Sequence, residues 1–122
     1  MASCSGNVRI HRAPGNAFID SISLKSGGGQ IAFVENWVLK FMSYDDGGAR
    51  LGPNYALPGC YRQFSVQFAP DGQSVIYGET CAGVRSFKRV AVPTADNPNP
   101  VPEILVDGLE YAYLGGFDGA GQ

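Results

Sequence analysis

Apolar and polar residues alternate at the start of residues 64–79, which read FSVQFAPDGQSVIYGE. A period of two residues is typical of a β-strand with one buried face. Residues 70–72 (PDG) then supply a fixed φ, a side chain that can bond to the backbone ahead of it, and a glycine that accepts positive φ. Val75, Ile76 and Tyr77 follow as a second apolar run, so the pattern predicts a β-hairpin.

The same unit occurs 44 residues earlier. Residues 21–28 (SISLKSGG) align with residues 65–72 (SVQFAPDG), and residues 31–35 (IAFVE) align with residues 75–79 (VIYGE). Each copy reads as strand, glycine-containing turn, strand and glutamate, so we expect an internal structural repeat.

Two further strands are expected in each copy. They are residues 37–44 and 49–57 in the first copy, and residues 84–92 and 103–106 in the second. The proline-rich residues 93–102 (PTADNPNPVP) are expected to form a surface loop. A third copy is expected to begin at Leu109, and residues 8–11 would be a strand left over from a preceding unit. The expected divisions are an N-terminal segment (1–17), a first unit (18–59), a second unit (60–108) and the start of a third (109–122).

Four antiparallel strands repeating every 40 to 50 residues or so are typical of β-propeller blades. Residues 68–77 (FAPDGQSVIY) resemble the first hairpin of the TolB-like, WD40-like repeat family, which reads approximately FSPDGKxIAFxS. Residues 24–33 (LKSGGGQIAF) match it more loosely, since they lack the Pro and the Asp. The resemblance covers residues 18–108. It implies an all-β fold of four-stranded antiparallel blades, two complete and others partial, and a protein-binding function outside the cytoplasm.

Two blades are too few to close a propeller, which needs about four. An open stack would leave apolar sheet faces uncovered, and such faces mark interaction surfaces. We expect copies of the chain to close a ring as a cyclic homo-oligomer, and another protein to be a further partner. Two alternatives remain: the chain is a fragment of a larger propeller, or its strands close locally into a sandwich or barrel.

Composition and charge narrow the function. The formal charge is −2, and the nine Lys and Arg residues are scattered, so nucleic acid is not an expected partner. Every apolar run is shorter than the roughly 18 residues that span a bilayer, so no transmembrane segment is expected. Residues 1–7 (MASCSGN) resemble the residues that flank the lipidated cysteine of bacterial lipoproteins, so Cys4 is either a lipid anchor or an ordinary thiol.

Cys60 and Cys81 are expected to face each other across the hairpin. If Ala69 faces Gln73, paired residue numbers add up to 142, and the two cysteine numbers add up to 141. Directly opposed antiparallel residues lie within disulfide reach. A disulfide and a pair of reduced thiols both remain open; a disulfide would fit a periplasmic or extracellular location, with the cytoplasm as the alternative.

Candidate catalytic groups are few. His11 is close to the N-terminus and is expected to be a solvent-facing edge residue rather than a base. Glu35 and Glu79 occupy equivalent positions and would be the acid–base candidates, but we expect them to end strands at the surface. Turn chemistry explains the aspartates next to glycines without a metal: Asp45, Asp46, Asp71 and Asp118. We therefore expect no enzyme activity, no metal and no cofactor.

Aromatic residues are the remaining binding resource. Tyr55 and Tyr61 lie near prolines or glycines at the end of a unit and are the expected ligand contacts. The expected function is a non-enzymatic, self-associating propeller-type module for protein–protein interaction. The alternatives are a carbohydrate-binding, lectin-like module and a non-catalytic fragment of a propeller-containing hydrolase.

Overall fold

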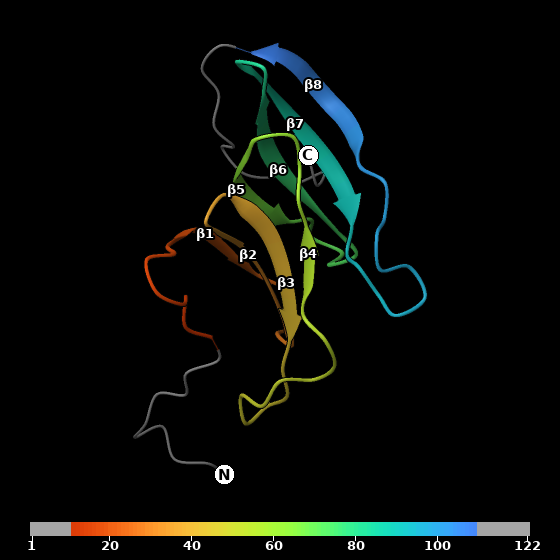
Figure 1. The fold of residues 1–122 in the computed structure, drawn as a ribbon. Helices are drawn as coiled ribbons and strands as arrows, with labels where there is room; N and C mark the ends of the chain where they lie inside the picture. The colour runs from red at the N-terminus through yellow and green to blue at the C-terminus, as the bar shows by residue number, and fades with distance from the viewer. Residues whose placement is uncertain (1–10, 110–122) are drawn as a thin grey trace.

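The computed structural model describes residues 11–109, which form two four-stranded antiparallel sheets (Figure 1). The first sheet contains β1 (Ile19–Leu24), β2 (Gln30–Glu35), β3 (Val38–Ser43) and β4 (Tyr55–Leu57). The second contains β5 (Arg62–Phe68), β6 (Ser74–Cys81), β7 (Val84–Ala91) and β8 (Glu103–Leu109). Strand order follows the chain in both sheets, and residues 11–109 contain no helix. The expected all-β fold of two four-stranded antiparallel sheets is confirmed.

The first hairpin of each sheet closes with the same hydrogen bonds. The Lys25 N–H donates to the Gln30 carbonyl across the first loop (3.0 Å), and the Ala69 N–H donates to the Ser74 carbonyl across the second (2.9 Å). The donors are 44 residues apart, and so are the acceptors. The first loop contains neither Pro nor Asp; three consecutive glycines with positive φ, residues 27–29, shape it instead.

The first strand of each sheet also carries a bulge in the same region. Pairing shifts by one residue between Ile19 and Ser21 in β1, and between Phe64 and Gln67 in β5. Residues 63–65 are the counterparts of residues 19–21 under the 44-residue offset, so the two shifts overlap. The repeat therefore includes the register of the strands as well as their order.

The two sheets pack face to face through unlike sides. Because side chains alternate across a strand, the residues of β2 and of β6 each divide into two sets, one on each face of the sheet. We define the front face of the first sheet as the face that carries Ile31 and Phe33, and the front face of the second as the face that carries Val75 and Tyr77. The back faces carry Ala32 and Val34 in the first sheet, and Ile76 and Gly78 in the second. The main core contains Ala32, Val34, Leu39 and Phe41 from the back of the first sheet, and Val66, Phe68, Val75, Tyr77 and Val90 from the second. The back of the first sheet thus packs on the front of the second.

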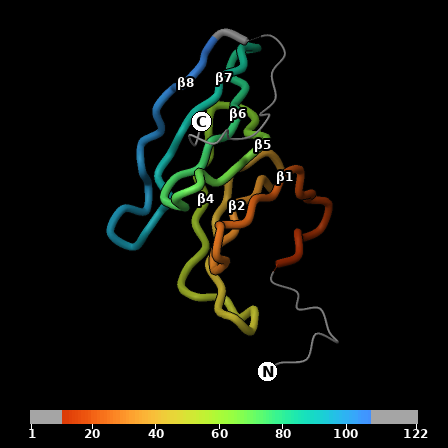
Figure 2. Tube along the Cα trace, turned by 180° about the vertical axis from the view of Figure 1, so that it is seen from behind, coloured from red at the N-terminus to blue at the C-terminus, as the bar shows by residue number. Residues whose placement is uncertain are grey.

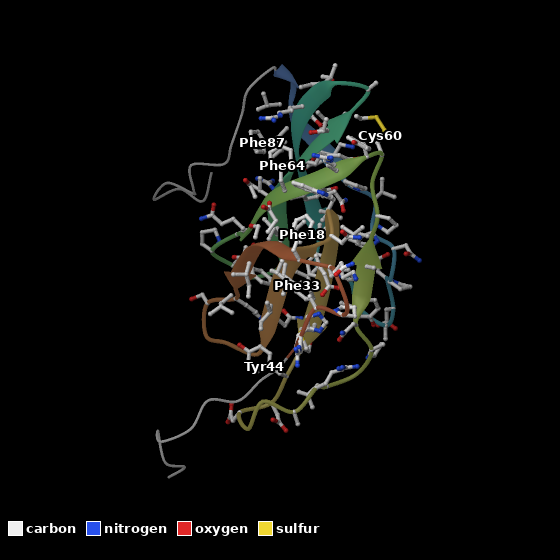
Figure 3. All side chains as sticks on the ribbon, turned by 60° about the vertical axis from the view of Figure 1, so that its left-hand side comes forward. Phe18, Phe33, Tyr44, Cys60, Phe64 and Phe87 are labelled. Atoms are coloured by element: carbon white, nitrogen blue, oxygen red, sulfur yellow. A yellow bond between two sulfur atoms is a disulfide. The ribbon has the colours of Figure 1, made fainter. Side chains whose placement is uncertain are left out.

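The outer faces of this pair are covered over their central strands and exposed along β1. On the front of the first sheet, Ile31, Phe33 and Met42 are buried, and the His11 ring lies 5.1 Å from the Phe33 ring. Ile22 and Leu24, on the same face, are 59% and 62% exposed. On the back of the second sheet, Phe64 and Phe87 meet edge to face with ring centroids 6.1 Å apart (Figure 3).

β1 and β5 meet where the two sheets join, as the ribbon and the Cα tube show (Figures 1 and 2). β5 is the first strand of its sheet, so its outer N–H groups have no partner strand within that sheet. The Ser21 hydroxyl accepts a hydrogen bond from the Val66 N–H (3.0 Å), and the Ser23 hydroxyl accepts one from Phe68 (3.0 Å). The polar positions of β1 thus cap the edge of the second sheet.

Some expected element boundaries were wrong. The fourth strand of the first unit is limited to β4, and an isolated bridge joins Tyr44 to Arg50. Gly52, with φ of 71°, and the following Pro53 interrupt the expected strand over residues 49–57. β8 extends to Leu109; the remainder of the expected third repeat, and residues 8–10 of the expected leftover strand, lie outside the described residues.

The close approach of Phe64 to Gly78 gives a test of the packing. A Cβ added at Gly78 would overlap the Phe64 ring, so Gly78→Ala should lower the free energy of unfolding by about 2 kcal/mol. Gly47→Ala is the matched control, because a Cβ there would meet only Asp45 Oδ1 at an ordinary 3.5 Å. Urea denaturation of both variants measures the difference. Equal stability of the two variants would contradict the described packing of Phe64.

Candidate functional site

An open cleft of about 380 Å³ lies where the ends of β1, β5 and the two central hairpins come together. It is lined by Asp20, Trp37, Tyr61, Arg62, Phe64, Ser65, Thr80 and Arg85. These residues come from both sheets, so the cleft depends on how the sheets pack. It combines aromatic walls, two guanidinium groups, two hydroxyls and one carboxylate.

Arg62 is held by two aromatic rings. Its guanidinium carbon lies 4.6 Å from the centroid of the Trp37 ring and 5.0 Å from the centroid of the Tyr61 ring. Arg85 is placed similarly, 5.5 Å from the Phe64 centroid. Each contact is a cation–π interaction, which contributes about 0.5 to 1 kcal/mol at an exposed site. Both cations of the cleft are therefore positioned by neighbouring rings.

Trp37 occupies a backbone position that normally belongs to glycine. The turn between β2 and β3 has φ of 51° at Asn36 and 68° at Trp37, the geometry of a type I′ hairpin turn. The corresponding turn of the second sheet has Ala82 (52°) and Gly83 (79°). A large side chain in this region costs on the order of 1 to 3 kcal/mol, and such strain is concentrated at functional sites. The turn directs the indole into the cleft, where Phe18 meets it edge to face at 5.3 Å.

A disulfide joins Cys60 to Cys81, with a Cα–Cα distance of 5.3 Å (Figure 3). Its two cysteines adjoin Tyr61 and Thr80, which both line the cleft. Of the two states left open by the sequence, the structure contains the bridge. It restrains the chain that carries Tyr61, and it is consistent with an oxidising compartment.

The two glutamates at equivalent repeat positions form equivalent ion pairs. Glu35 Oε1 lies 2.7 Å from Lys40 Nζ, and Glu79 Oε1 lies 3.0 Å from Lys88 Nζ. The expectation that they lie at the surface was wrong, because only 2% of the surface of Glu35 and 3% of that of Glu79 are exposed. Both glutamates lie on the front face of the second strand of their sheet, Glu35 at its end and Glu79 two residues before its end, with lysine on the neighbouring strand. Period-two alternation places them on that face but does not reveal what covers it.

His11 also lies elsewhere than expected. Its Nε2 atom is 2.6 Å from Glu35 Oε2, so the ring contacts the buried carboxylate instead of facing solvent at a strand edge. Burial alone would raise the pKa of Glu35, but hydrogen bonds and positive charge from Lys40 and His11 outweigh it, and the pKa is lowered. In the second sheet, the Cys60 N–H donates to Glu79 Oε2 at 2.6 Å. Both carboxylates therefore have partners at both oxygens, an arrangement that suits structural support.

A second cleft, of about 390 Å³, lies beside the Glu79–Lys88 pair. Gln63 lines it and is engaged on both sides: its Oε1 accepts from the Leu39 N–H (2.6 Å), and its Nε2 donates to the Leu57 carbonyl (2.7 Å). A Cβ at Gly59 would collide with the Glu79 carboxylate. Gln63 thus joins β5 to β3 and β4, so we assign this cleft a structural role.

The two expected ligand-contact tyrosines have different locations. Tyr61 lines the aromatic cleft and is 65% exposed, whereas Tyr55 packs against the main core. The sequence reasoning missed Arg62 and Arg85, because nothing in their local sequence reveals that Trp37 and Phe64, more than 20 residues away, are their aromatic partners. A signal was available in Trp37, a bulky residue where a two-residue hairpin turn favours glycine.

The turn aspartates act as expected where they are described. Asp45 Oδ1 accepts hydrogen bonds from the Gly47 and Ala49 N–H groups (both 2.9 Å), and Asp71 Oδ1 accepts one from Gln73 (2.9 Å). In the described part of the chain, no cluster of three or more His, Cys, Asp or Glu residues could hold a metal. Asp118 and Cys4 lie outside the described residues.

Comparison with protein-family models, with curated proteins and with solved structures gave no match. Among residues 11–109, no helix is long and apolar enough to cross a membrane. The candidate site is therefore defined by the geometry of this chain alone.

The buried ion pair of Glu35 makes a pH-dependent prediction. Glu35→Gln should lower the free energy of unfolding by about 2 kcal/mol at neutral pH, because Lys40 and His11 would lose their common partner; partial exposure of the lysine limits the loss. Since the folded-state pKa is lowered, the stabilisation is present above the ordinary pKa of 4.5 and is lost as the pH falls through the folded-state value.

Denaturant unfolding of wild type and variant between pH 7 and about pH 3 measures the difference between their free energies of unfolding. This difference should become smaller as the pH falls. The matched control is Glu103→Gln: this glutamate is exposed, and its nearest Arg89 nitrogen is 3.5 Å away, so its loss should change stability by less than about 0.5 kcal/mol. A loss of stability for Glu35→Gln that is independent of pH would contradict a stabilising role for the ionised Glu35 carboxylate.

Proposed function

We propose that this chain is a non-enzymatic binding module of the propeller type that acts by contact with other proteins and with copies of itself. The observation that carries the proposal is a row of exposed apolar side chains on β1. Ile22 is 59% exposed and Leu24 is 62% exposed, although both lie in the middle or at the end of a regular strand. Exposed apolar rows of this kind are typical of interaction surfaces.

Ile22 and Leu24 lie on one side of β1. β1 turns Ser21 and Ser23 towards β5, so alternation places Ile22 and Leu24 on its other side, the front face of the first sheet. Asp20, at the β1 bulge, lines the cleft together with residues of β5. An extended segment of a partner could therefore lie along the apolar row on the front face.

Front-to-back packing supports the propeller-type interpretation. Units that meet through unlike faces can continue as a stack or ring, whereas units that meet through like faces form a closed pair. The 44-residue repeat in hairpin closure and bulge position fits the same interpretation.

Self-association is supported by a second apolar surface. On β8, the last strand of its sheet, Ile104, Leu105 and Val106 are all exposed. Two different apolar strands on one chain suit a contact in which unlike surfaces of two copies meet. The disulfide supports a location in an oxidising compartment, and we propose the periplasm or the extracellular space.

Binding is favoured over catalysis because Glu35 and Glu79 are each neutralised by their own lysine. A carbohydrate-binding module is the second candidate, supported by the exposed ring of Tyr61. The Trp37 ring is less suited to stacking on a sugar, since Arg62 lies over it and Phe18 contacts it edge to face.

Light scattering tests the proposal directly. Wild-type protein should have a solution mass that is a multiple of the 12.9 kDa chain, and the double variant Ile22→Asn with Leu24→Asn should shift towards the mass of one chain. Leu51→Asn is the matched control, because Leu51 is 52% exposed but lies outside β1. A monomeric wild type would contradict self-association. A positive glycan array that depends on Tyr61 and not on the β1 residues would favour the carbohydrate-binding candidate.

A further inference from the structure

We propose that the aromatic cleft binds a carboxylate group of a partner polypeptide, with Arg62 as its anchor. The inference rests on the proposed function, because it names the chemistry that the protein-binding surface recognises. It is carried by the arrangement of Arg62, Trp37 and Tyr61 described above, together with the charges around them.

Arg62 presents N–H donors for which the structure shows no acceptor among residues 11–109. Its side chain lies over two rings, is exposed, and has no carboxylate partner within residues 11–109. Stacking uses the π-faces of the rings and leaves the guanidinium N–H groups available at its edge. Two parallel N–H groups match the two oxygens of a carboxylate. Among the groups that a peptide carries at neutral pH, a carboxylate forms the strongest pair with arginine.

The rings also prepare Arg62 for binding. A free arginine side chain loses up to about 2 kcal/mol of rotamer entropy when a ligand fixes it. Contacts with Trp37 and Tyr61 restrict the side chain before any ligand arrives, and the neighbouring disulfide restrains the backbone at residue 60. Preorganisation of this kind raises affinity without additional contacts.

Charge in the cleft favours an anion. Among the lining residues, Arg62 and Arg85 are cations and Asp20 is a carboxylate; Arg85 has a partner within the chain, so we assign the negative charge of the ligand to Arg62. A planar carboxylate matches the edge of the guanidinium group, and it brings less negative charge towards Asp20 than a dianionic phosphate does. The Ser65 and Thr80 hydroxyls can donate further hydrogen bonds, and the rings can accept an apolar neighbour of the acid.

The backbone at Trp37 supports the same inference independently. The second sheet has Gly83 at the corresponding turn position, whereas the first retains an indole at φ of 68°. Trp37→Gly would satisfy the turn and remove the ring, so it separates the ring's contribution to binding from the hairpin's contribution to folding.

Isothermal titration calorimetry with synthetic peptides tests the inference. One pair is N-acetyl-Ala-Phe-Leu with a free carboxylate and its C-terminal amide; the other is N-acetyl-Phe-Glu-Leu-amide and its Gln analogue. The pairs distinguish a chain-terminal from a side-chain carboxylate. At least one acidic peptide should bind about tenfold or more tightly than its neutral partner, the ratio expected for charge-assisted hydrogen bonds. Inorganic phosphate, the third probe, should bind more weakly than that peptide.

Arg62→Gln should weaken binding of the acidic peptide about tenfold or more and leave the neutral peptide unchanged. Trp37→Gly should also weaken binding. Arg62→Lys should bind the acidic peptide more tightly than Arg62→Gln but more weakly than wild type, because lysine is not bidentate. Arg50→Gln is the matched control, an exposed arginine outside the cleft that should have no effect. Thermal unfolding of each variant verifies that it folds.

Equal binding of acidic and neutral peptides, no binding of either acidic peptide, or tighter binding of phosphate would overturn the inference. These outcomes are independent of the proposed function. If the β1 variants abolish association while no acidic peptide binds, the carboxylate inference fails alone. If the acidic peptide binds through Arg62 while wild-type protein is monomeric, self-association fails alone.

Discussion

Ala32 and Val34, on the back of the first sheet, pack in one core with Val75 and Tyr77, on the front of the second. This contact between unlike faces brings β1 beside β5, and so places Asp20 and Trp37 next to Tyr61 and Arg62. If like faces met instead, the turn between β2 and β3 would lie away from the start of β5, and no cleft would join them. The cleft is therefore a consequence of how two repeats stack.

Buried polar groups give this packing a fixed register. The Glu35–Lys40 and Glu79–Lys88 pairs occupy corresponding places, and a one-residue slip would move each carboxylate to the opposite face of its strand. The remaining oxygen of each glutamate contacts the segment that precedes the sheet, through His11 in one case and the Cys60 amide in the other. The carboxylates thus connect each sheet to the chain segment that precedes it, which explains why they are paired and buried. A structural role fits these surroundings better than acid–base chemistry does.

Local pattern predicted the parts of this structure that depend on neighbours in sequence. The alternation before residues 70–72 and the 44-residue offset predicted the hairpins, and hairpin pairing placed Cys60 opposite Cys81. Contacts between distant residues were not predictable in this way. The burial of Glu35 depends on what lies over its sheet, and the contact of Arg62 with Trp37 joins an exposed strand residue to a turn. The resemblance to propeller repeats suggested stacked blades but gave no indication that the chain covers the central strands of its outer faces and leaves β1 exposed.

The most direct test of the front-to-back arrangement is a set of nuclear Overhauser cross-peaks in the protein labelled at methyl and aromatic positions. The account predicts cross-peaks that join the methyl groups of Ala32 and Val34 to the Val75 methyls and the Tyr77 ring. It also predicts none between Val34 and Ile76, because Ile76 lies on the far side of the second sheet. Cross-peaks between Val34 and Ile76, without contacts to Tyr77, would show that like faces meet and would contradict the account.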